Sequence, residues 1–196
     1  MKKFLPALLV LILLTATAHA ATTPVRIARL PIIFQSTIPD LETRTELEMK
    51  IARAVHIPLN KTLNYAEYLP TKDCTQALSD IWQRLRAENK KSKLADAMRP
   101  LAAALDADIV VCPVLLRYSQ YEMNGWDEVI LNSTARAELI VYDRRTDALV
   151  DKKFSQMFNE PYHPRGTASA LAKFCFDKVI DATHLRNLIM SIRGDN

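Results

Sequence analysis

One apolar run decides the fold of this chain: Ile109-Val110-Val111-Cys112-Pro113-Val114-Leu115-Leu116. The run is rich in β-branched residues and too short for most helices, so it predicts a buried central strand. After the turn signal Asn124-Gly125, residues 129–143 alternate between apolar side chains such as Leu139 on one face and mostly polar ones such as Glu138 on the other, which is typical of a second strand. A polar turn at 144–147 leads into a third alternating run. The middle of the chain is therefore predicted to be an antiparallel meander.

Strands and helices are expected to alternate ahead of this meander. Short apolar runs predict the strands, and apolar residues at helical spacing predict the helices. In chain order we expect a strand at 25–34, a helix from Pro39-Asp40 to Pro58, a strand at 63–69, a helix after Thr71 or Asp73, and a helix at 94–105. Pro31 favours a sheet edge or a strand end, and Pro100 should kink the last of these helices or mark the first turn of a separate one.

A long helix from about Thr167 to Ile192 is expected to close the chain, with Phe174 and Cys175 on its apolar face. The complete order is β-α-β-α-β-β-β-α, which predicts a mixed α/β fold with a mixed sheet. The leading strands should lie parallel through right-handed crossovers, and the meander should add antiparallel partners.

The first twenty residues have the organisation of a secretory signal peptide. Lys2-Lys3 are followed by the apolar core Leu5 to Leu14 and by the small-x-small site Ala18-His19-Ala20. We expect residues 1–20 to be a signal and 21–196 a single domain that is exported, periplasmic or secreted, with no stable membrane span. An uncleaved anchor is the competing interpretation, but the apolar run is shorter than the roughly 20 residues that cross a bilayer.

The net charge and the positions of the cysteines bear on which classes of protein are expected. The formal net charge of +4 falls to +2 without the two signal lysines, and no basic stripe with interleaved aromatics is present, so no nucleic-acid partner is expected. A lipoprotein would carry a cysteine at the cleavage point, whereas the first cysteine is Cys74. Cys112 in the central strand and Cys175 in the last helix could meet as a disulfide; the alternative is that they are buried thiols.

No catalytic or cofactor motif is present. The three glycines form no phosphate-binding loop, and no Gly-x-Ser-x-Gly elbow occurs. Asp177, Asp181 and His184 share one face of the last helix and could ligate a divalent metal, but a single helix rarely supplies a full ligand set. We therefore expect no catalytic residues, no cofactor and no metal, and a protein that is not an enzyme.

Two loops are the candidate partner-binding sites. Tyr121, Trp126 and Asp127 cluster at the first hairpin turn together with Tyr118 and Met123, and exposed aromatics are residues that anchor protein contacts. Ordinary hairpin packing is the alternative. The second loop carries the residues Tyr162, His163 and Arg165. It leads into the last helix, whose first N–H groups could hold an anion.

Three short motifs resemble a known group of envelope domains. They are Leu30-Pro31-Ile32-Ile33-Phe34, then Ala107-Asp108-Ile109-Val110-Val111, and the hairpin from 137 to 150 with its acidic residue before a threonine-containing turn. Their arrangement resembles the TolB amino-terminal domain, the periplasmic domain of the curli-secretion channel subunit and the lipoproteins that activate penicillin-binding proteins. The resemblance implies a mixed α/β domain that works in the envelope through protein contacts and without catalysis.

This chain departs from that group in three respects. It lacks a lipid-bearing cysteine, it has Asp147 where glycine is common, and its length leaves no room for membrane-spanning hairpins. No functional residue is carried over, because the matched positions build the sheet.

The leading hypothesis is an exported, non-catalytic protein that binds another envelope protein or a cell-wall component. The alternative is a secreted hydrolase or small-ligand binder whose dispersed site would draw on the residues His56, His163, His184, Asp177 and Asp181.

Overall fold

The computed structural model describes residues 23–88, 91–124 and 128–194, with side chains described as far as Ser191. The predicted signal peptide, Trp126 and Asp127 lie outside the described residues. No helix within the described ranges is both long and apolar enough to span a bilayer.

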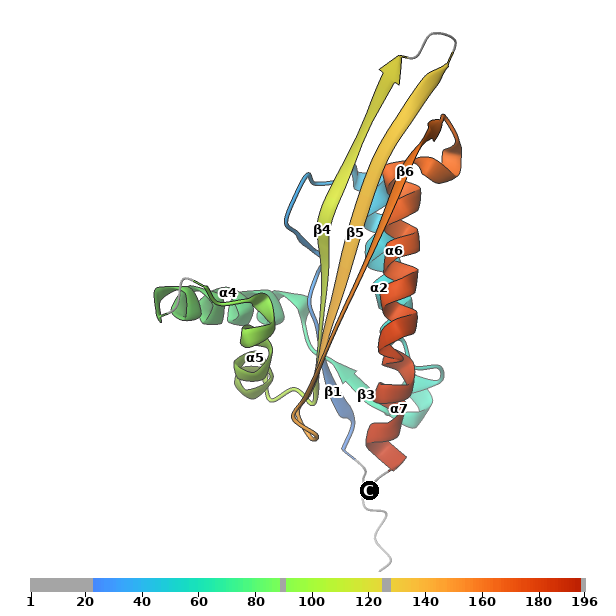
Figure 1. Ribbon diagram of the computed structural model, residues 1–196. Coiled ribbons are helices and arrows are strands. Elements are labelled where there is room, and N and C mark those ends of the chain that lie inside the picture. Colours follow the sequence, from blue (N-terminus) through green and yellow to red (C-terminus); the bar gives the residue numbers. More distant parts are fainter. Residues whose placement is uncertain (1–22, 89–90, 125–127, 195–196) are drawn as a thin grey trace, which may run out of the picture.

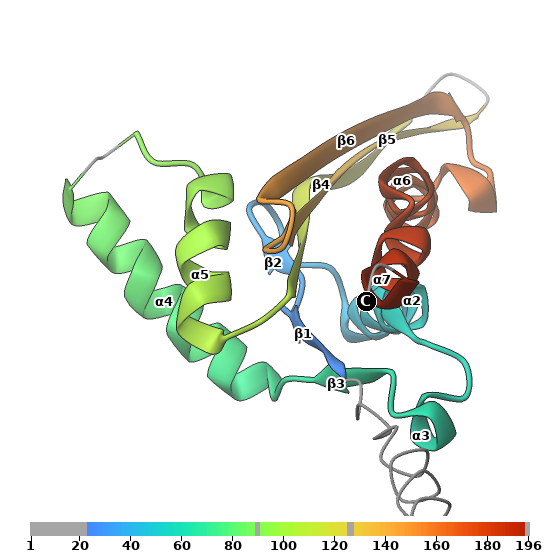
Figure 2. The same ribbon diagram turned by 90° about the horizontal axis from the view of Figure 1, so that it is seen from below.

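A six-stranded mixed sheet lies between two layers of helices (Figures 1 and 2). The strands are β1 (Val25–Arg29), β2 (Ile33–Phe34), β3 (Ala66–Tyr68), β4 (Ile109–Asn124), β5 (Val129–Asp143) and β6 (Ala148–Pro161). The helices are α2 (Leu41–Val55), α3 (Asn60–Leu63), α4 (Thr71–Glu88), α5 (Met98–Leu105), α6 (Ala168–Thr183) and α7 (Leu185–Gly194), with short 3-10 helices η1 (Leu94–Ala97) and η2 (Pro164–Gly166). The predicted mixed α/β class is confirmed.

Strand β4 is the centre of the sheet. The strand order is β3-β1-β4-β5-β6, with β2 also paired to β4. β1 and β2 run parallel to β4, whereas β5 runs antiparallel to it and β6 antiparallel to β5. The predicted meander is therefore present, and its first strand extends eight residues beyond the apolar run, from Leu116 to Asn124.

The expected first strand is divided by Pro31. The Leu30 N–H still donates to the Val111 carbonyl at 2.9 Å, but Pro31 has no N–H and interrupts the ladder. The Ile32 N–H donates instead to the Glu48 carboxylate of α2 at 2.6 Å. A strand that reads as continuous in the sequence is thus two strands with a helix carboxylate at the gap.

Two further elements differ from the expectation. The predicted strand at 63–69 contains only β3, because the residues before it form the short helix α3 and Asn64 adopts a left-handed conformation with φ 44°. The closing helix is divided at His184, which has φ 47°. Neither glycine nor proline marks that division, so the sequence predicted one helix. Pro100 lies in the first turn of α5, as one of the two predicted alternatives had it.

Each face of the sheet has its own apolar core. One core joins α2, α6 and α7 to the sheet through residues such as Leu47, Ile51 and Phe176. The other joins α4 and α5 to the opposite face through residues such as Ile81 and Met98. The two helical layers therefore do not touch through the sheet.

This division decides between the two alternatives for Cys112 and Cys175: a disulfide between them is excluded, and the buried-thiol alternative holds. Cys112 belongs to the core under α5, and Cys175 belongs to the core under α6, so the sheet separates them. Both are free, buried thiols, as is Cys74. Burial raises the pKa of the Cys112 thiol far above its usual range and that of Cys175 to about 11, which keeps both protonated.

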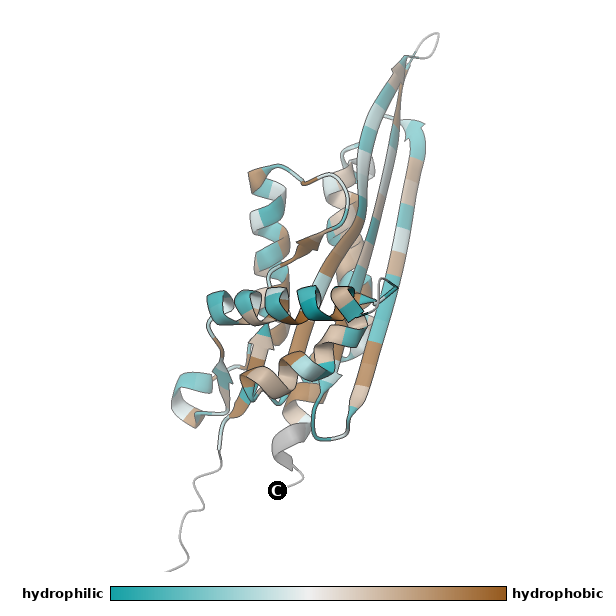
Figure 3. Ribbon diagram, turned by 90° about the vertical axis from the view of Figure 1, so that its left-hand side faces the viewer, coloured by the Kyte–Doolittle hydropathy of each residue, from teal (hydrophilic) through white to brown (hydrophobic). Residues whose placement is uncertain are grey.

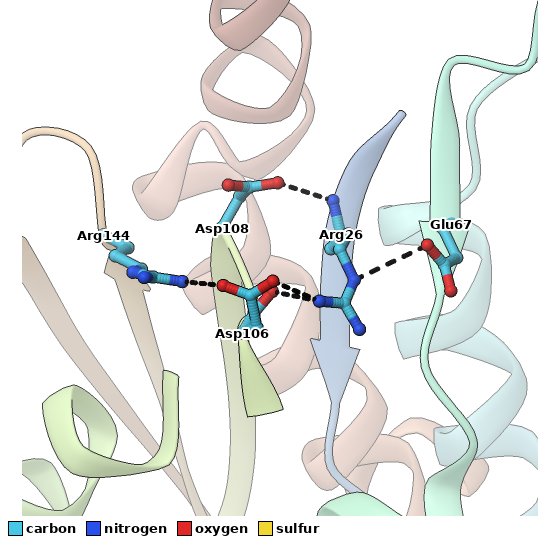
Figure 4. Close-up of polar contacts among 5 residues, drawn as sticks. All are labelled: Arg26, Glu67, Asp106, Asp108 and Arg144. Carbon is cyan, nitrogen blue, oxygen red and sulfur yellow. Dashed lines mark hydrogen bonds and ion pairs between the residues drawn. The ribbon is translucent and has the colours of Figure 1, made fainter. Parts of the chain in front are cut away.

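A polar cluster fixes the start of the sheet (Figure 4). The Asp106 carboxylate contacts Arg26 of β1 and Arg144 of the β5–β6 turn, each at 2.6 Å. The Asp108 carboxylate accepts the Arg26 N–H at 2.7 Å, and Glu67 of β3 lies 3.5 Å from the Arg26 guanidinium. Two guanidinium groups and three carboxylates contact one another here, and each of the five side chains has a partner within the cluster, so we interpret the cluster as structural.

We expect Asp106→Asn to lower the thermal unfolding midpoint at pH 7. Arg144 first, and then Arg26, holds the pKa of Asp106 below its usual range, so this carboxylate stabilises the fold above about pH 4 and the contribution is lost as pH falls through the lowered pKa. Asparagine tolerates the left-handed φ of 49° at this position. The difference between wild type and variant should therefore narrow in acid, as measured by circular dichroism melts from pH 7 to pH 2.

Asp181→Asn is the matched control, because the Asp181 side chain is exposed and forms no ion pair with any described residue. If Asp106→Asn lowers the thermal unfolding midpoint by the same amount at every pH, the carboxylate does not have this role.

Candidate functional site

The upper part of the β4–β5–β6 ribbon is covered by helices on one side only. β4 and β5 extend past the ends of α2 and α6 (Figure 1). On the opposite side, α4 and α5 cross the lower part of the sheet and leave the upper strands open (Figure 3). A sheet face without a covering element is where apolar side chains become available to a partner.

Apolar side chains gather on this open face. The register places Met123, Ile130 and Pro161 in one row across the three strands, with Tyr121 one pair further down β4. Tyr121 is 53% exposed and Met123 is 45% exposed, and Met157 on β6 is 67% exposed on the same face. We call these five residues the ribbon patch.

The residues of the first predicted loop lie on different faces of the sheet. Tyr121 and Met123 belong to the ribbon patch. Tyr118 lies on the other face, where it packs against the core beneath α6, and burial raises the pKa of its hydroxyl. The ordinary packing alternative therefore holds for Tyr118.

The second predicted loop joins the same end of the sheet. The Tyr162 N–H donates to the Val129 carbonyl at 3.1 Å, and the Tyr162 side chain is exposed. His163 Nδ1 accepts the Arg165 N–H at 3.1 Å, so this histidine caps η2. The loop is thus tied to the beginning of β5.

The predicted anion site at the last helix is not supported. The Ala168 N–H donates to Gln120 Oε1 at 2.8 Å, and the Ala170 N–H donates to the Thr167 hydroxyl at 3.3 Å. These α6 groups already have partners inside the protein. The Gln120 contact crosses 48 residues of sequence, which local patterns do not reveal.

The dispersed site considered for a hydrolase is not assembled. Asp177 contacts Lys50 of α2 at 2.5 Å, while Asp181 and His184 line a separate surface recess. Neither His56 nor His163 lines a described pocket with these residues. In the part of the chain that the structure describes, no three His, Cys, Asp or Glu side chains are placed to hold a metal ion.

A larger recess of about 800 Å³ lies between α4, η1 and the sheet. Its apolar wall is made of Ile33, Leu78, Trp82, Leu94, Leu116 and Ile140. Arg86 lies over the Trp82 ring, 5.1 Å from its centroid, at one side. We call this cavity the α4 recess.

A buried carboxylate faces the α4 recess. Glu138 is 7% exposed, and its carboxylate lies 2.8 Å from Lys153 Nζ, which also contacts Asp151 at 2.9 Å. Burial raises the pKa of Glu138 although Lys153 opposes the shift, and the two carboxylates raise the pKa of Lys153. The recess thus combines apolar walls with one ammonium group, Lys153, held between two carboxylates.

The alternation in the sequence predicted Glu138 on the polar outer face of its strand. That face is instead covered by the α4–α5 layer, where Ile140 and Tyr142 are buried beside it. Their apolar character was the available signal that β5 is buried on both faces.

We expect Lys153→Met to lower the free energy of unfolding by about 1–3 kcal/mol at pH 7, because a buried carboxylate would lose its charged partner. Because the folded-state pKa of Glu138 is raised, protonation of this carboxyl group stabilises the folded state as the pH falls through that pKa. The loss of unfolding free energy in Lys153→Met should therefore shrink as the pH falls toward 4. Urea unfolding at several pH values measures this. Lys72→Met, at an exposed α4 position, is the control, and an equal deficit at all pH values would contradict the pairing.

Comparisons with known proteins give similar folds at low similarity. No protein-family model matches the chain, and no curated protein is significantly similar. The hypothetical protein CT253 from Chlamydia trachomatis is 14% identical, with a TM-score of 0.45 over 82% of this chain and 96% of that one. The lipoprotein GNA1162 from Neisseria meningitidis is 16% identical, with a TM-score of 0.37 over 81% and 99%.

The LpoB C-terminal domain from Salmonella enterica is 12% identical, with a TM-score of 0.32 over 76% of this chain and 92% of that one. The similar structures thus include lipoproteins, and none of them establishes the TolB-like resemblance. At these scores the similarity carries no functional argument, so the proposals below rest on this chain's own residues.

Proposed function

We propose that this protein is a non-catalytic binding module that acts after export and holds a protein partner against the ribbon patch. The observation that carries the proposal is the open sheet face bearing Tyr121, Met123 and Met157, which are about half to two-thirds exposed. Tyrosine and methionine are enriched at protein interfaces, because they bury large apolar areas while remaining adaptable. The signal-like first twenty residues support the location.

The shape of the ribbon supports the same function. The register places the patch residues on the sheet face opposite α6, and α4 and α5 leave the upper strands of that face uncovered (Figure 3), so a partner can approach without displacing a helix. The Tyr162 N–H contact to Val129 holds the third strand in register at this end. The binding surface is therefore built on paired strands, which favours a preformed interface.

We expect a photoreactive amino acid at Tyr121 or Met123 to crosslink one dominant protein in intact cells. The same amino acid at Asp181, on α6, is the control position. Met123→Glu should remove most of the Tyr121 crosslink, because a charge in the centre of an apolar contact is costly to desolvate. If the crosslinking yield at Tyr121 is no higher than at Asp181, the proposal is wrong.

A second candidate function is the binding of a small amphiphilic ligand in the α4 recess. It is favoured by the volume of about 800 Å³, the Trp82 wall and the buried Glu138–Lys153 pair, which together resemble the mostly apolar pockets with few polar groups that hold small molecules.

We expect the dye 1-anilinonaphthalene-8-sulfonate to bind this recess and Ser79→Trp to weaken its binding by about tenfold, because Ser79 lines the recess and a tryptophan there would fill it. Asp80→Trp, at the next and non-lining position, is the matched control. Fluorescence titration measures both. Equal dye binding by the two variants would exclude the recess as the site.

A further inference from the structure

Strand β6 forms one outer edge of the sheet. It pairs with β5 along its whole length, and within the described residues no strand pairs with its other side. The register with β5 shows no irregularity over the 14 residues. A long regular edge is a template for another strand, and proteins usually protect such an edge with charges, prolines or bulges.

The backbone groups that point outward follow from one hydrogen bond. The Tyr162 N–H donates to the Val129 carbonyl, so by the alternation of an antiparallel ladder the even-numbered β6 residues bond to β5. The backbone groups at Lys153, Ser155, Met157 and Asn159 then point to the free edge. The Gln156 side chain donates to the Met157 carbonyl at 3.3 Å, which is consistent with a carbonyl that lacks a backbone partner.

The upper half of this edge has little protection. From Phe154 to Glu160 there is neither a cation nor a proline, and Pro161 comes only at the end. Beside the edge, the Phe174 ring of α6 is 42% exposed although it lies on the helix face predicted to be buried, and it contacts the Phe154 ring edge-on at 5.7 Å. Apolar side chains thus accompany the open backbone groups.

We propose that β6 pairs antiparallel with β6 of a second copy of this chain, about a two-fold axis that passes through Gln156. Ser155 of each copy would exchange backbone hydrogen bonds with Met157 of the other, and Lys153 would do so with Asn159. The two sheets would become one continuous sheet, because a two-fold axis perpendicular to the sheet keeps each helical layer on the same face as the corresponding layer of the other copy.

Charge selects this register. With Gln156 on the axis, Lys152 of each copy lies opposite Glu160 of the other, and Phe154 lies opposite Phe158. Lys152 and Glu160 are both exposed, and neither forms an ion pair with another described residue. Moving the register by two residues would place Lys152 opposite Phe158 or Tyr162 and would lose both charge pairs.

The same register avoids Pro161. This residue would lie opposite Asp151 at the end of the ladder, so its missing N–H costs no central hydrogen bond. Side chains at directly opposed positions lie about 5 Å apart, which is close enough for the Lys152 and Glu160 side chains to pair. When two β6 strands pair antiparallel in this register, their opposed side chains are therefore complementary.

Dimerisation would also extend the ribbon patch. Met157 lies on the open face beside the axis, so the patches of two copies would stand on the same face of one sheet. A partner that binds the patch would meet two linked sites, which raises its avidity without any new contact.

The test is sedimentation of the protein expressed from its full sequence and purified as the cell processes it. We expect the wild type to dimerise reversibly, Lys152→Glu and Glu160→Lys each to weaken the dimer by about tenfold or more, and the double variant to restore it, because its charge pairs are exchanged but complementary. A wild type that stays monomeric, or single variants that dimerise as well as the wild type, would overturn the proposal.

A cysteine pair tests the register independently. Two Gln156→Cys copies would face each other at a non-hydrogen-bonded position with Cα atoms about 4.5 Å apart, which is within disulfide reach. Asn159→Cys is the control on the same edge, since its two copies would be about 20 Å apart. The three native cysteines are buried and give no background. Mild oxidation should crosslink Gln156→Cys alone; equal crosslinking of both variants, or of neither, contradicts the register.

Discussion

The structure depends on the burial of the first part of β4, residues 109–115, on both faces. This strand must pair on both edges and carry apolar side chains on both sides, because each face lies under a separate helical layer. β1 and β2 satisfy one edge in parallel, and β5 satisfies the other edge. Every other element is placed by this requirement: α2 and α6 cover one face, and α4 and α5 cover the other.

Strands β4 and β5 extend past the helices beside them, and the candidate functional surfaces result from this extension. The α4 recess lies between α4, η1 and the sheet. Beyond α4 and α5, the upper strands that carry the ribbon patch have no covering helix on that face (Figure 3). The same extension makes β6 a long, regular edge. The open face and the open edge are thus two results of one geometric fact, namely that the meander strands are longer than the helices beside them.

Local patterns predicted those elements that depend on neighbouring residues. The 109–116 run, the alternation of 129–143 and the helix start at Pro39-Asp40, where the Asp40 side chain accepts the Thr43 N–H, all act within a few residues. Local patterns did not predict contacts with distant elements. A strand end at Pro31 was predicted, but the Glu48 carboxylate that accepts the next N–H was not. Likewise, only the structure shows that the sheet separates Cys112 from Cys175.

The candidate site shows the same contrast between what local patterns predict and what distant contacts decide. Tyr121 and Met123 were predicted from their exposed-loop chemistry, but Met157 joined them only through the register of three strands, and Glu138 was expected on the outer face. The sequence by itself determined the strand and helix periods, the expected export and the order of elements, because these depend on local spacing and composition. Only the tertiary structure decided which faces are covered, which charges pair and which edge stays open, because those depend on contacts between residues far apart in the chain.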